Sequence, residues 1–336
     1  MKEFILKLSE HQDLTREEAS SAMRTIMDGA ANDSQIAGFL MALRLKGETP
    51  DELLGFVEVM RARSVKITIE DGDAIDMCGT GGDGTGTFNI STVASFVVAG
   101  AGVTVAKHGN RSISSACGSA DVLKELSINI DLPPETIESC INSVGIGFLF
   151  APLFHPAMKH AARSRADLGV KTCFNLLGPM TNPAGVRRQV VGAFSHDAAR
   201  TMASVFARLD TASVLVLHSH DGLDEISLEA PTTVFDVNNQ PSGSTYDLDP
   251  ESFGLSTVRR WSILGGSAPE NAAIAINVLG GKEGPHRDIV LANAALGLLV
   301  SGKARNIHEG VLLAAESIDS GRAMEKLHLL RTATAR

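Results

Sequence analysis

The stretch DMCGTGGDGTGTFNIST, residues 76–92, constrains the fold of this chain more than any other segment. Five of the eight residues that begin at Gly79 are glycine. Because glycine readily adopts positive φ angles, such a cluster indicates a tight turn in which the backbone follows an unusual course. The polar residues Asn89, Ser91 and Thr92 follow at once, where a helix is predicted to begin. We therefore expect a strand, a glycine-rich turn and a helix in succession.

Several kinds of phosphate-binding loop contain glycines at such spacing. Gly79, Gly81 and Gly84 match the G-x-G-x-x-G pattern of dinucleotide-binding folds, but residues 98–108 lack the acidic residue expected about 20 positions later. A P-loop requires Lys directly after its last glycine, whereas Gly84 and Gly86 are each followed by Thr. A third kind is a cradle of backbone N–H groups beside a helix N-terminus. The polar side chains after the loop favour this cradle over a tight turn without a ligand.

A second polar segment, KHGNRSISSACGSADVL at residues 107–123, follows the apolar run AGVTVA. We expect it at the carboxyl end of a strand, the edge at which open α/β sheets bind ligands. Lys107 and Arg111 supply positive charge, and Asn110 supplies an amide that both donates and accepts. Hydroxyl groups come from Ser112, Ser114, Ser115 and Ser119. Ser119 alone could equally cap a helix that starts near residue 120, but the density of polar groups predicts a binding segment.

From about residue 70 onward, short apolar runs alternate with glycine-rich turns and helical segments. VTVAKHG, FLFAP, VVGAF and SVLVLHS are typical of buried strands, and residues 190–219 form a strand–helix–strand unit. Such alternation indicates an α/β domain with a mostly parallel central sheet. Residues 236–260 are rich in turn formers, and we expect them to form an excursion on the surface.

Residues 1–65 contain only helical patterns. Two capping boxes open helices, at Thr15–Glu18 and at Thr49–Glu52, and a third helix between them closes at Gly47. The fold class that we predict is a small N-terminal helical domain followed by a large α/β domain. The expected boundaries are 1–66 for the helical domain, completed by helices from about 160–185, and 70–336 for the α/β domain.

Composition narrows the class of protein. A net charge of −9 disfavours a sequence-independent nucleic-acid binder, which needs a basic surface. No apolar run approaches the roughly 20 residues that span a bilayer, and the charged N-terminal segment is unlike a secretory signal. The four cysteines, at positions 78, 117, 140 and 173, lack CxxC spacing, so we expect reduced thiols in a cytoplasmic protein that binds neither membrane nor nucleic acid.

Together, the segments GTGGDGTGTFNIST and KHGNRSISSACGSADVL closely resemble the signatures of the anthranilate phosphoribosyltransferase family. The resemblance continues in the family's order through residues 148–183, 222–227 and 271–296, and therefore covers nearly the whole chain. It implies the nucleoside-phosphorylase-like fold. It also implies an enzyme of tryptophan biosynthesis that joins the ribose of 5-phosphoribosyl 1-pyrophosphate (PRPP) to the amine of anthranilate and releases pyrophosphate.

The resemblance further implies three groups of ligands and a homodimer formed through the helical domain. For PRPP the implied residues are Gly79, Gly82, Asp83, Thr87, Asn89, Ile90, Ser91, Thr92, Lys107 and Ser119. For anthranilate they are Gly79, His108, Asn110, His155 and Arg165. For Mg²⁺, expected as two ions, they are Ser91, Asp224 and Glu225.

The charged residues of these groups can also be interpreted from their own positions in the sequence. Asp224 and Glu225 follow the apolar run SVLVLH, and an acidic pair of this kind is commonly a solvated surface feature. In a loop, however, both carboxylates can turn toward one cation. The family resemblance favours this second interpretation, a metal site. Asp83 would be repelled by phosphate, so we expect it to meet ribose hydroxyls or metal-bound water. Arg163 lies two residues from Arg165 on a different helix face, and we expect it to be solvated or ion-paired.

The predicted reaction is direct displacement at the anomeric carbon through an oxocarbenium-like transition state. An aromatic amine is neutral at pH 7, so catalysis needs positioning and charge stabilisation rather than a protein nucleophile. Two rival functions remain. A pyrimidine nucleoside phosphorylase would share the fold but would not need the acidic pair, and a nucleic-acid-binding relative without transferase activity would be basic and lack Asn110 and Arg165.

Overall fold

The computed structural model describes residues 1–111, 117–237 and 244–335. Its first four helices are α1 (Lys2–Ser9), α2 (Arg16–Met27), α3 (Asp33–Lys46) and α4 (Pro50–Arg63). Both predicted capping boxes are formed, at the starts of α2 and α4, and α3 ends at Gly47 with a φ of 91°. The prediction of an all-helical start is therefore confirmed.

Seven strands of the described chain form one sheet, in the order β3-β2-β1-β4-β5-β6-β7. Their bounds are β1 (Ile75–Gly79), β2 (Val105–Gly109), β3 (Ile146–Phe150), β4 (Arg188–Gly192), β5 (Ser213–Ser219), β6 (Thr232–Asp236) and β7 (Ser244–Leu248). Neighbouring strands among β1 to β5 pair in parallel, whereas β6 pairs antiparallel with β5 and β7 pairs antiparallel with β6. The predicted mostly parallel sheet is confirmed. Strand order reverses between β1 and β4, which makes that pair the topological switch point, where ligands bind in open α/β sheets.

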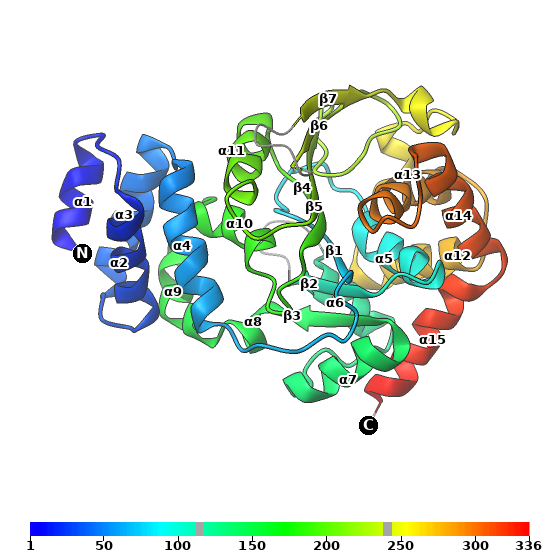
Figure 1. The fold of residues 1–336 in the computed structure, drawn as a ribbon, viewed down its shortest axis with the longest axis horizontal. Coiled ribbons are helices and arrows are strands. Elements are labelled where there is room, and N and C mark those ends of the chain that lie inside the picture. The colour runs from blue at the N-terminus through cyan, green and yellow to red at the C-terminus, as the bar shows by residue number, and fades with distance from the viewer. Residues whose placement is uncertain (112–116, 238–243, 336) are drawn as a thin grey trace.

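The remaining helices cover both faces of the sheet (Figure 1). They are α5 (Ile90–Gly100), α6 (Ser119–Glu125), α7 (Pro134–Val144), α8 (Ala151–Phe154), α9 (Lys159–Leu168), α10 (Cys173–Leu177), α11 (His196–Phe206), α12 (Ala268–Leu279), α13 (Pro285–Val300), α14 (Ile307–Asp319) and α15 (Arg322–Thr334), with short 3₁₀ turns η1 (Pro156–Met158), η2 (Pro179–Thr181), η3 (Pro250–Phe253) and η4 (Arg260–Ser262). In Figure 1, α5 and α12 to α15 lie on one side of the sheet, and α11 and the N-terminal helices lie on the other.

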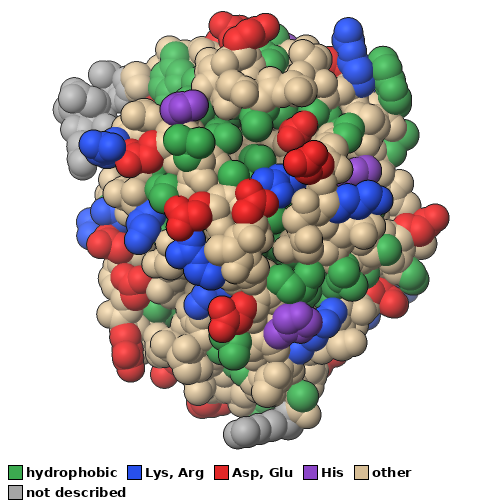
Figure 2. Space-filling view, turned by 90° about the vertical axis from the view of Figure 1, so that its right-hand side faces the viewer, with side chains coloured by type: hydrophobic (Ala, Val, Ile, Leu, Met, Phe, Trp, Pro, Cys, Tyr) green, Lys and Arg blue, Asp and Glu red, His purple; other side chains and the backbone are tan. Residues whose placement is uncertain are grey.

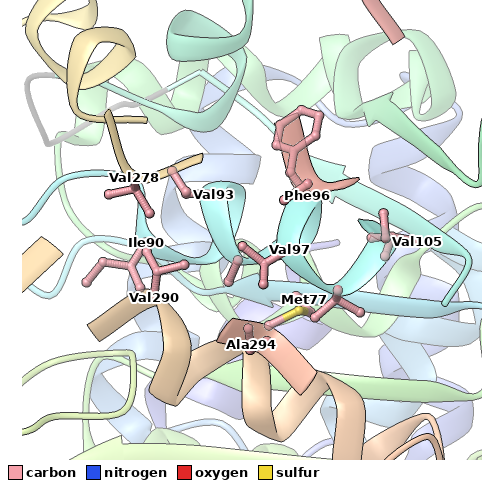
Figure 3. Packing of buried hydrophobic residues seen from close by; sticks show 14 of the residues in the cluster. Met77, Ile90, Val93, Phe96, Val97, Val105, Val278, Val290 and Ala294 are labelled. Carbon is pink, nitrogen blue, oxygen red and sulfur yellow. The ribbon is translucent and has the colours of Figure 1, made fainter. Parts of the chain in front are cut away.

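Side chains along β5 alternate between two cores. On β5, Leu215 and Leu217 join the core with α5 and α13, whereas Val214 and Val216 join the core shared with α11 and the N-terminal helices. This is the period of two that a pleated strand imposes, and burial on both faces is typical of parallel sheets. Figure 3 shows the first core, in which Met77 of β1 lies among side chains of α5 and α13.

The prediction of a surface excursion over residues 236–260 is wrong in part. Ser244–Leu248 forms the edge strand β7, which pairs with β6, and Phe253 and Val258 are buried. The first residues of β7 are exposed, so the strand carries the same polar residues as a turn and the sequence pattern does not separate the two. Residues 238–243 of this segment lie outside the described residues.

The surface shows two further properties. Among the described residues, no helix combines the length and the apolar character needed to cross a bilayer. On the face at the right of Figure 1, acidic and basic side chains are interspersed (Figure 2). That face therefore lacks the continuous basic stripe on which nucleic-acid binding depends.

We expect Gly100, at the end of α5, to tolerate no side chain. A Cβ there would lie 2.6 Å from the Ala323 backbone nitrogen and would also press against Ser317 Oγ. Gly100→Ala should lower the free energy of unfolding by about 1–3 kcal/mol, the usual cost of overpacking a core. Chemical denaturation measures this change. Gly72→Ala, where a Cβ would meet open space, is the control, and equal losses in the two variants would contradict the packing argument.

Candidate active site

The glycine-rich turn joins the end of β1 to the start of α5, at the switch point of the sheet. Gly81, Gly82, Gly84 and Gly86 have φ angles of 64°, 72°, 75° and 71°. Residues with a Cβ rarely adopt such angles, so the course of the turn depends on glycine at these four positions. The helix that follows has no side-chain cap, and its Ile90 N–H donates to the Phe88 carbonyl at 2.8 Å.

The acidic pair reaches this turn from the loop after β5. The Gly81 N–H donates to Asp224 Oδ2 at 2.9 Å, and the Ser91 N–H donates to Glu225 Oε1 at 3.1 Å. The two carboxylates therefore face the glycine-rich turn and the N-terminus of α5, although 143 and 134 residues separate the partners along the chain.

Two glycines make room for the acidic pair. Gly79 and Gly192 are register partners at the ends of β1 and β4. A Cβ at Gly79 would lie 2.6 Å from Asp224 Oδ2, and a Cβ at Gly192 would collide with the Asp224 backbone carbonyl. Gly192 was not among the predicted site residues. Its one signal in the sequence is a glycine inside the strand run VVGAF, which marks a close approach of another backbone.

The charges of this region are not balanced by the protein alone. Burial raises the pKa of both Asp224 and Glu225, and the carboxylate of Asp83 and mutual repulsion raise that of Asp224 further. The ammonium of Lys107 acts in the opposite sense on Glu225. A divalent cation would relieve this repulsion, and hard cations prefer oxygen ligands of this kind.

The donor set fits Mg²⁺ only in part. In the described ranges, no three His, Cys, Asp or Glu side chains are grouped so that they could hold a metal ion by themselves. Ser91, Asp224 and Glu225 offer one hydroxyl and two carboxylates near one another. An ion held by these residues would need further oxygen atoms from a ligand, which is typical of Mg²⁺ sites that bind phosphates.

Lys107 brings a buried cation to the same place. Its Nζ donates to the Met77 carbonyl at 2.5 Å and lies 3.4 Å from Ser91 Oγ, to which it also donates. The side chain is almost fully buried, with 4% of the residue exposed. The ammonium therefore stands between β1 and α5, beside the hydroxyl of Ser91.

The space for Lys107 arises because β1 and β2 separate early. They pair at Ile75 and Val105, whereas β1 pairs with β4 along its full length. Beyond that point the side chain of Asp76 accepts the hydrogen bonds in place of backbone carbonyls. Its Oδ1 accepts from the His108 N–H at 3.1 Å, and its Oδ2 accepts from Asn182 Nδ2 at 2.9 Å. Side chains thus bridge the two strands that carry the predicted PRPP and anthranilate residues.

On the other side of β2, His108 and His155 lie together with ring centroids 5.2 Å apart. His108 Nδ1 is 3.2 Å from the Gly178 carbonyl, which can only accept, so Nδ1 carries the proton. The Nε2 atoms of both rings are buried and have no hydrogen-bond partner among the described residues. Burial lowers the pKa of His108 to about 3 and that of His155 to about 4. Both rings are therefore neutral at pH 7.

Arg165 and Arg163 have different surroundings. The Arg165 guanidinium lies 5.1 Å from the ring centroid of Phe174, and burial lowers its pKa. Within the described ranges it has no carboxylate partner. Arg163 is exposed and forms ion pairs with Asp33 and Asp167, which confirms the prediction made for it. A half-buried cation without an acid favours an anionic ligand, because leaving it unpaired costs free energy.

Some predicted residues do not present their side chains to this region. Ile90 and Thr92 are buried, and Ile90 belongs to the core in Figure 3, so their side chains face the interior. The Ile90 N–H donates to the Phe88 carbonyl at 2.8 Å. Thr87 forms an isolated bridge with Leu264. Asp83 accepts from Thr85 Oγ1 at 2.5 Å and so closes its own turn.

The polar segment after β2 is described only in part. The carbonyl of Asn110 accepts from Ser119 Oγ at 3.2 Å, and the Asn110 side chain accepts from the Arg111 N–H at 2.8 Å. Asn89 donates from Nδ2 to the Cys117 carbonyl at 3.3 Å. Three of the predicted hydroxyl groups lie outside the described residues, namely those of Ser112, Ser114 and Ser115.

Comparison with known proteins identifies this arrangement. The chain matches the glycosyl transferase family, with its helical bundle domain over residues 2–64 and its a/b domain over residues 71–324. The fold and the site thus define a glycosyl transferase. Over 332 residues the chain is 52% identical to the anthranilate phosphoribosyltransferase of Pelotomaculum thermopropionicum, an alignment that covers 98% of this chain and 95% of the relative. The chain belongs to the anthranilate phosphoribosyltransferase family.

Solved structures agree with this membership. The anthranilate phosphoribosyltransferase of Thermus thermophilus superposes with a TM-score of 0.93 at 41% identity, covering 99% of each chain. The Saccharomyces cerevisiae enzyme in complex with PRPP and Mg superposes with a TM-score of 0.91 at 28% identity, covering 99% of this chain and 97% of that one. The same yeast enzyme in complex with 4-fluoroanthranilate gives a TM-score of 0.88. The family and the fold predicted from the sequence are confirmed.

We expect the two buried histidines to weaken the protein in mild acid. Unfolded histidine titrates near 6.5, whereas folded His108 and His155 titrate near 3 and 4. Below pH 6.5 the unfolded chain therefore binds more protons, and the free energy of unfolding should fall by about 2 kcal/mol per histidine between pH 7 and pH 5. Chemical denaturation at the two pH values measures this loss.

The double variant His108→Asn, His155→Asn removes both titrating groups and should lose clearly less stability over the same pH interval. His328, which is exposed on α15, provides the matched control: His328→Asn should lose as much as the wild type. If the double variant loses as much as the wild type, the assignment of buried neutral rings is wrong.

Proposed function

We propose that this enzyme transfers the phosphoribosyl group of PRPP to the amine of anthranilate and gives N-(5-phosphoribosyl)anthranilate and pyrophosphate. The observation that carries the proposal is the meeting of the glycine-rich turn, the Lys107 ammonium and the carboxylates of Asp224 and Glu225 at one edge of the sheet. Carboxylates alone would repel a pyrophosphate. Backbone N–H groups, a lysine and a cation-binding acidic pair together suit a phosphorylated substrate that brings Mg²⁺.

The donor half of the site is assigned to PRPP. The proposed ligands are Gly79, Gly82, Asp83, Thr87, Asn89, Ile90, Ser91, Thr92, Lys107 and Ser119, with Ile90 and Thr92 contributing backbone groups. Support comes from the positive φ angles of the turn and from its position at the N-terminus of α5, where the helix dipole favours an anion. The yeast relative was solved in complex with PRPP and Mg.

We propose that Ser91, Asp224 and Glu225 hold Mg²⁺, with two ions at saturation. The raised pKa values of the two carboxylates, caused by burial and repulsion, support a site that gains stability from divalent charge. When bound, Mg²⁺ supplies positive charge that neutralises the departing pyrophosphate. The protein itself contributes the fixed direction of its carboxylates and the ammonium of Lys107.

The acceptor half is assigned to anthranilate, with Gly79, His108, Asn110, His155 and Arg165 as proposed ligands. Arg165, which has no carboxylate partner among the described residues, suits a carboxylate, and the neutral rings of His108 and His155 suit an uncharged aromatic amine. These groups are connected, because Arg165 packs on Phe174 of α10 and the carbonyl that follows α10 accepts from His108. The yeast relative was also solved in complex with 4-fluoroanthranilate.

The proposed chemistry is displacement of pyrophosphate by the neutral amine at the anomeric carbon. The chain holds the two substrates in one geometry and places charge at the leaving group. The lowered pKa of His108 makes its ring a weak base, so its proposed task is to orient the amine through Nε2 rather than to remove a proton before attack.

We also propose the domain division of 1–66 with about 160–185 as the helical domain and 70–336 as the α/β domain. Ser164 Oγ donates to the Asp33 carbonyl at 3.1 Å, and Arg44 donates to the Lys171 carbonyl at 2.7 Å, which ties the first half of the later segment to α3. A homodimer through the helical domain is proposed as well, and a cytoplasmic location, which the four free cysteines support.

The activity is tested by incubating the purified protein with PRPP, Mg²⁺ and anthranilate and by following the loss of free anthranilate. We expect anthranilate to be consumed only when PRPP and Mg²⁺ are both present. Cleavage of thymidine by phosphate without Mg²⁺, in place of this reaction, would show a nucleoside phosphorylase instead.

Glu225→Gln should lower turnover by about 10²–10³-fold at saturating substrates, the range found when a charge-stabilising group is removed from a transition state. The exposed Glu251 of η3 is the control, and Glu251→Gln should keep wild-type turnover. Unchanged turnover in Glu225→Gln would rule out the metal assignment while leaving the transfer reaction in place.

A further inference from the structure

Two buried asparagines lie in the segment 271–296, and neither belongs to the three proposed groups of ligands. Asn271 on α12 is 3% exposed, and Asn293 on α13 is 1% exposed. A buried amide is costly unless its donors and its acceptor are paired, so the partners of each amide indicate its role.

Asn293 pairs with both backbone groups of Ile226, the residue directly after the acidic pair. Its Oδ1 accepts from the Ile226 N–H at 2.9 Å, and its Nδ2 donates to the Ile226 carbonyl at 3.3 Å and to the Ile289 carbonyl of its own helix at 2.9 Å. Before the acidic pair, the Ser219 N–H donates to the Leu223 carbonyl at 3.0 Å. The backbone is therefore held on both sides of residues 224–225.

Asn271 makes the corresponding contacts at the end of the glycine-rich turn. Its Nδ2 donates to Asn89 Oδ1 at 3.1 Å, and its Oδ1 accepts from the Gly266 N–H at 2.8 Å. The neighbouring Gly265 N–H donates to the Gly86 carbonyl at 2.9 Å. Asn271 thus joins the end of the glycine-rich turn, at the N-cap of α5, to the chain that lies beside it.

We propose that Asn293 and Asn271 are positioning residues for separate halves of the site, an inference that rests on the proposed function. Asn293 sets the direction of the carboxylates that hold Mg²⁺. Asn271 sets the glycine-rich turn that holds the phosphate groups of PRPP. Each acts through the backbone or side chain of another residue.

The physical reason is that one amide can both donate and accept along a single stretch of backbone. Without Asn293, the Ile226 N–H would be left unpaired in the interior, and the loop would shift to find a partner. Glu225 is bonded to Ile226, so its carboxylate would turn with the loop and leave Ser91. Without Asn271, the amide of Asn89 would be held by its bond to the Cys117 carbonyl alone, while the acidic pair kept its own support.

The matched variants Asn293→Ala and Asn271→Ala test this division. Calorimetric titration with PRPP at a series of Mg²⁺ concentrations gives the Mg²⁺ concentration for half-maximal binding and the Kd of PRPP at saturating Mg²⁺. Outer-shell residues commonly change metal affinity by about 10–100-fold, so Asn293→Ala should raise the Mg²⁺ requirement at least about tenfold and leave the Kd within about threefold. Asn271→Ala should instead raise the Kd of PRPP at saturating Mg²⁺ and leave the Mg²⁺ requirement nearly unchanged.

Equal changes in both variants, or no change in either, would overturn the division of roles. The wild type separates this outcome from failure of the proposed function. Wild-type protein that binds PRPP with Mg²⁺ but does not consume anthranilate would overturn the transfer reaction alone. Wild-type protein that does not bind PRPP with Mg²⁺ would overturn both.

If Asn293→Ala does not fold, a measurement on the wild type tests the positioning role of Asn293 instead. The Ile226 amide lies in a loop but is bonded to a side chain on α13. Residue-resolved hydrogen exchange should show it exchanging as slowly as the amides in the middle of α13. Exchange as fast as that of exposed loop amides would show that Asn293 does not hold this backbone, and would overturn its positioning role.

Discussion

The active site depends on the close approach of Asp224 to the paired ends of β1 and β4. Because Gly79 and Gly192 are register partners without side chains, the loop after β5 can cross these strand ends until a carboxylate accepts from the Gly81 N–H. A side chain at either glycine would push the acidic pair away from the turn. This approach places the oxygens that we propose as Mg²⁺ ligands beside the N-terminus of α5.

The two halves of the site differ in the charge of the ligand that each is proposed to bind. On the donor side, a protein of net charge −9 must hold a polyanion, and we propose that it does so with backbone N–H groups, the buried ammonium of Lys107 and carboxylates whose repulsion a divalent cation would relieve. On the acceptor side, the neutral rings of His108 and His155 are proposed to act together with the guanidinium of Arg165, which has no carboxylate partner among the described residues. An uncharged aromatic amine with a single carboxylate matches that second environment.

Several features were predictable because they depend on neighbours in the chain. Capping boxes, the strands of the parallel sheet and the glycine-rich turn all follow from short-range hydrogen bonds and periodicity. The edge strand β7 was missed because its exposed face looks like a turn. Gly192, Asn271 and Asn293 were missed as members of the site for another reason: each acts on a segment far away in sequence, and a lone glycine or asparagine inside a strand or a helix carries no sign of its partner.

By itself the sequence determined the conformations that local sterics permit, such as the positive φ angles of the turn after β1 and the helix starts at Thr15 and Thr49. It also identified the family through motifs spread along the chain. Only the tertiary structure decided through which contacts the two acids meet the turn, that Ile90 and Thr92 turn inward, and that two helices hold the loops in place. The reason is physical: these contacts join residues up to 182 positions apart, so they exist only after the strand order has brought those residues to one edge of the sheet.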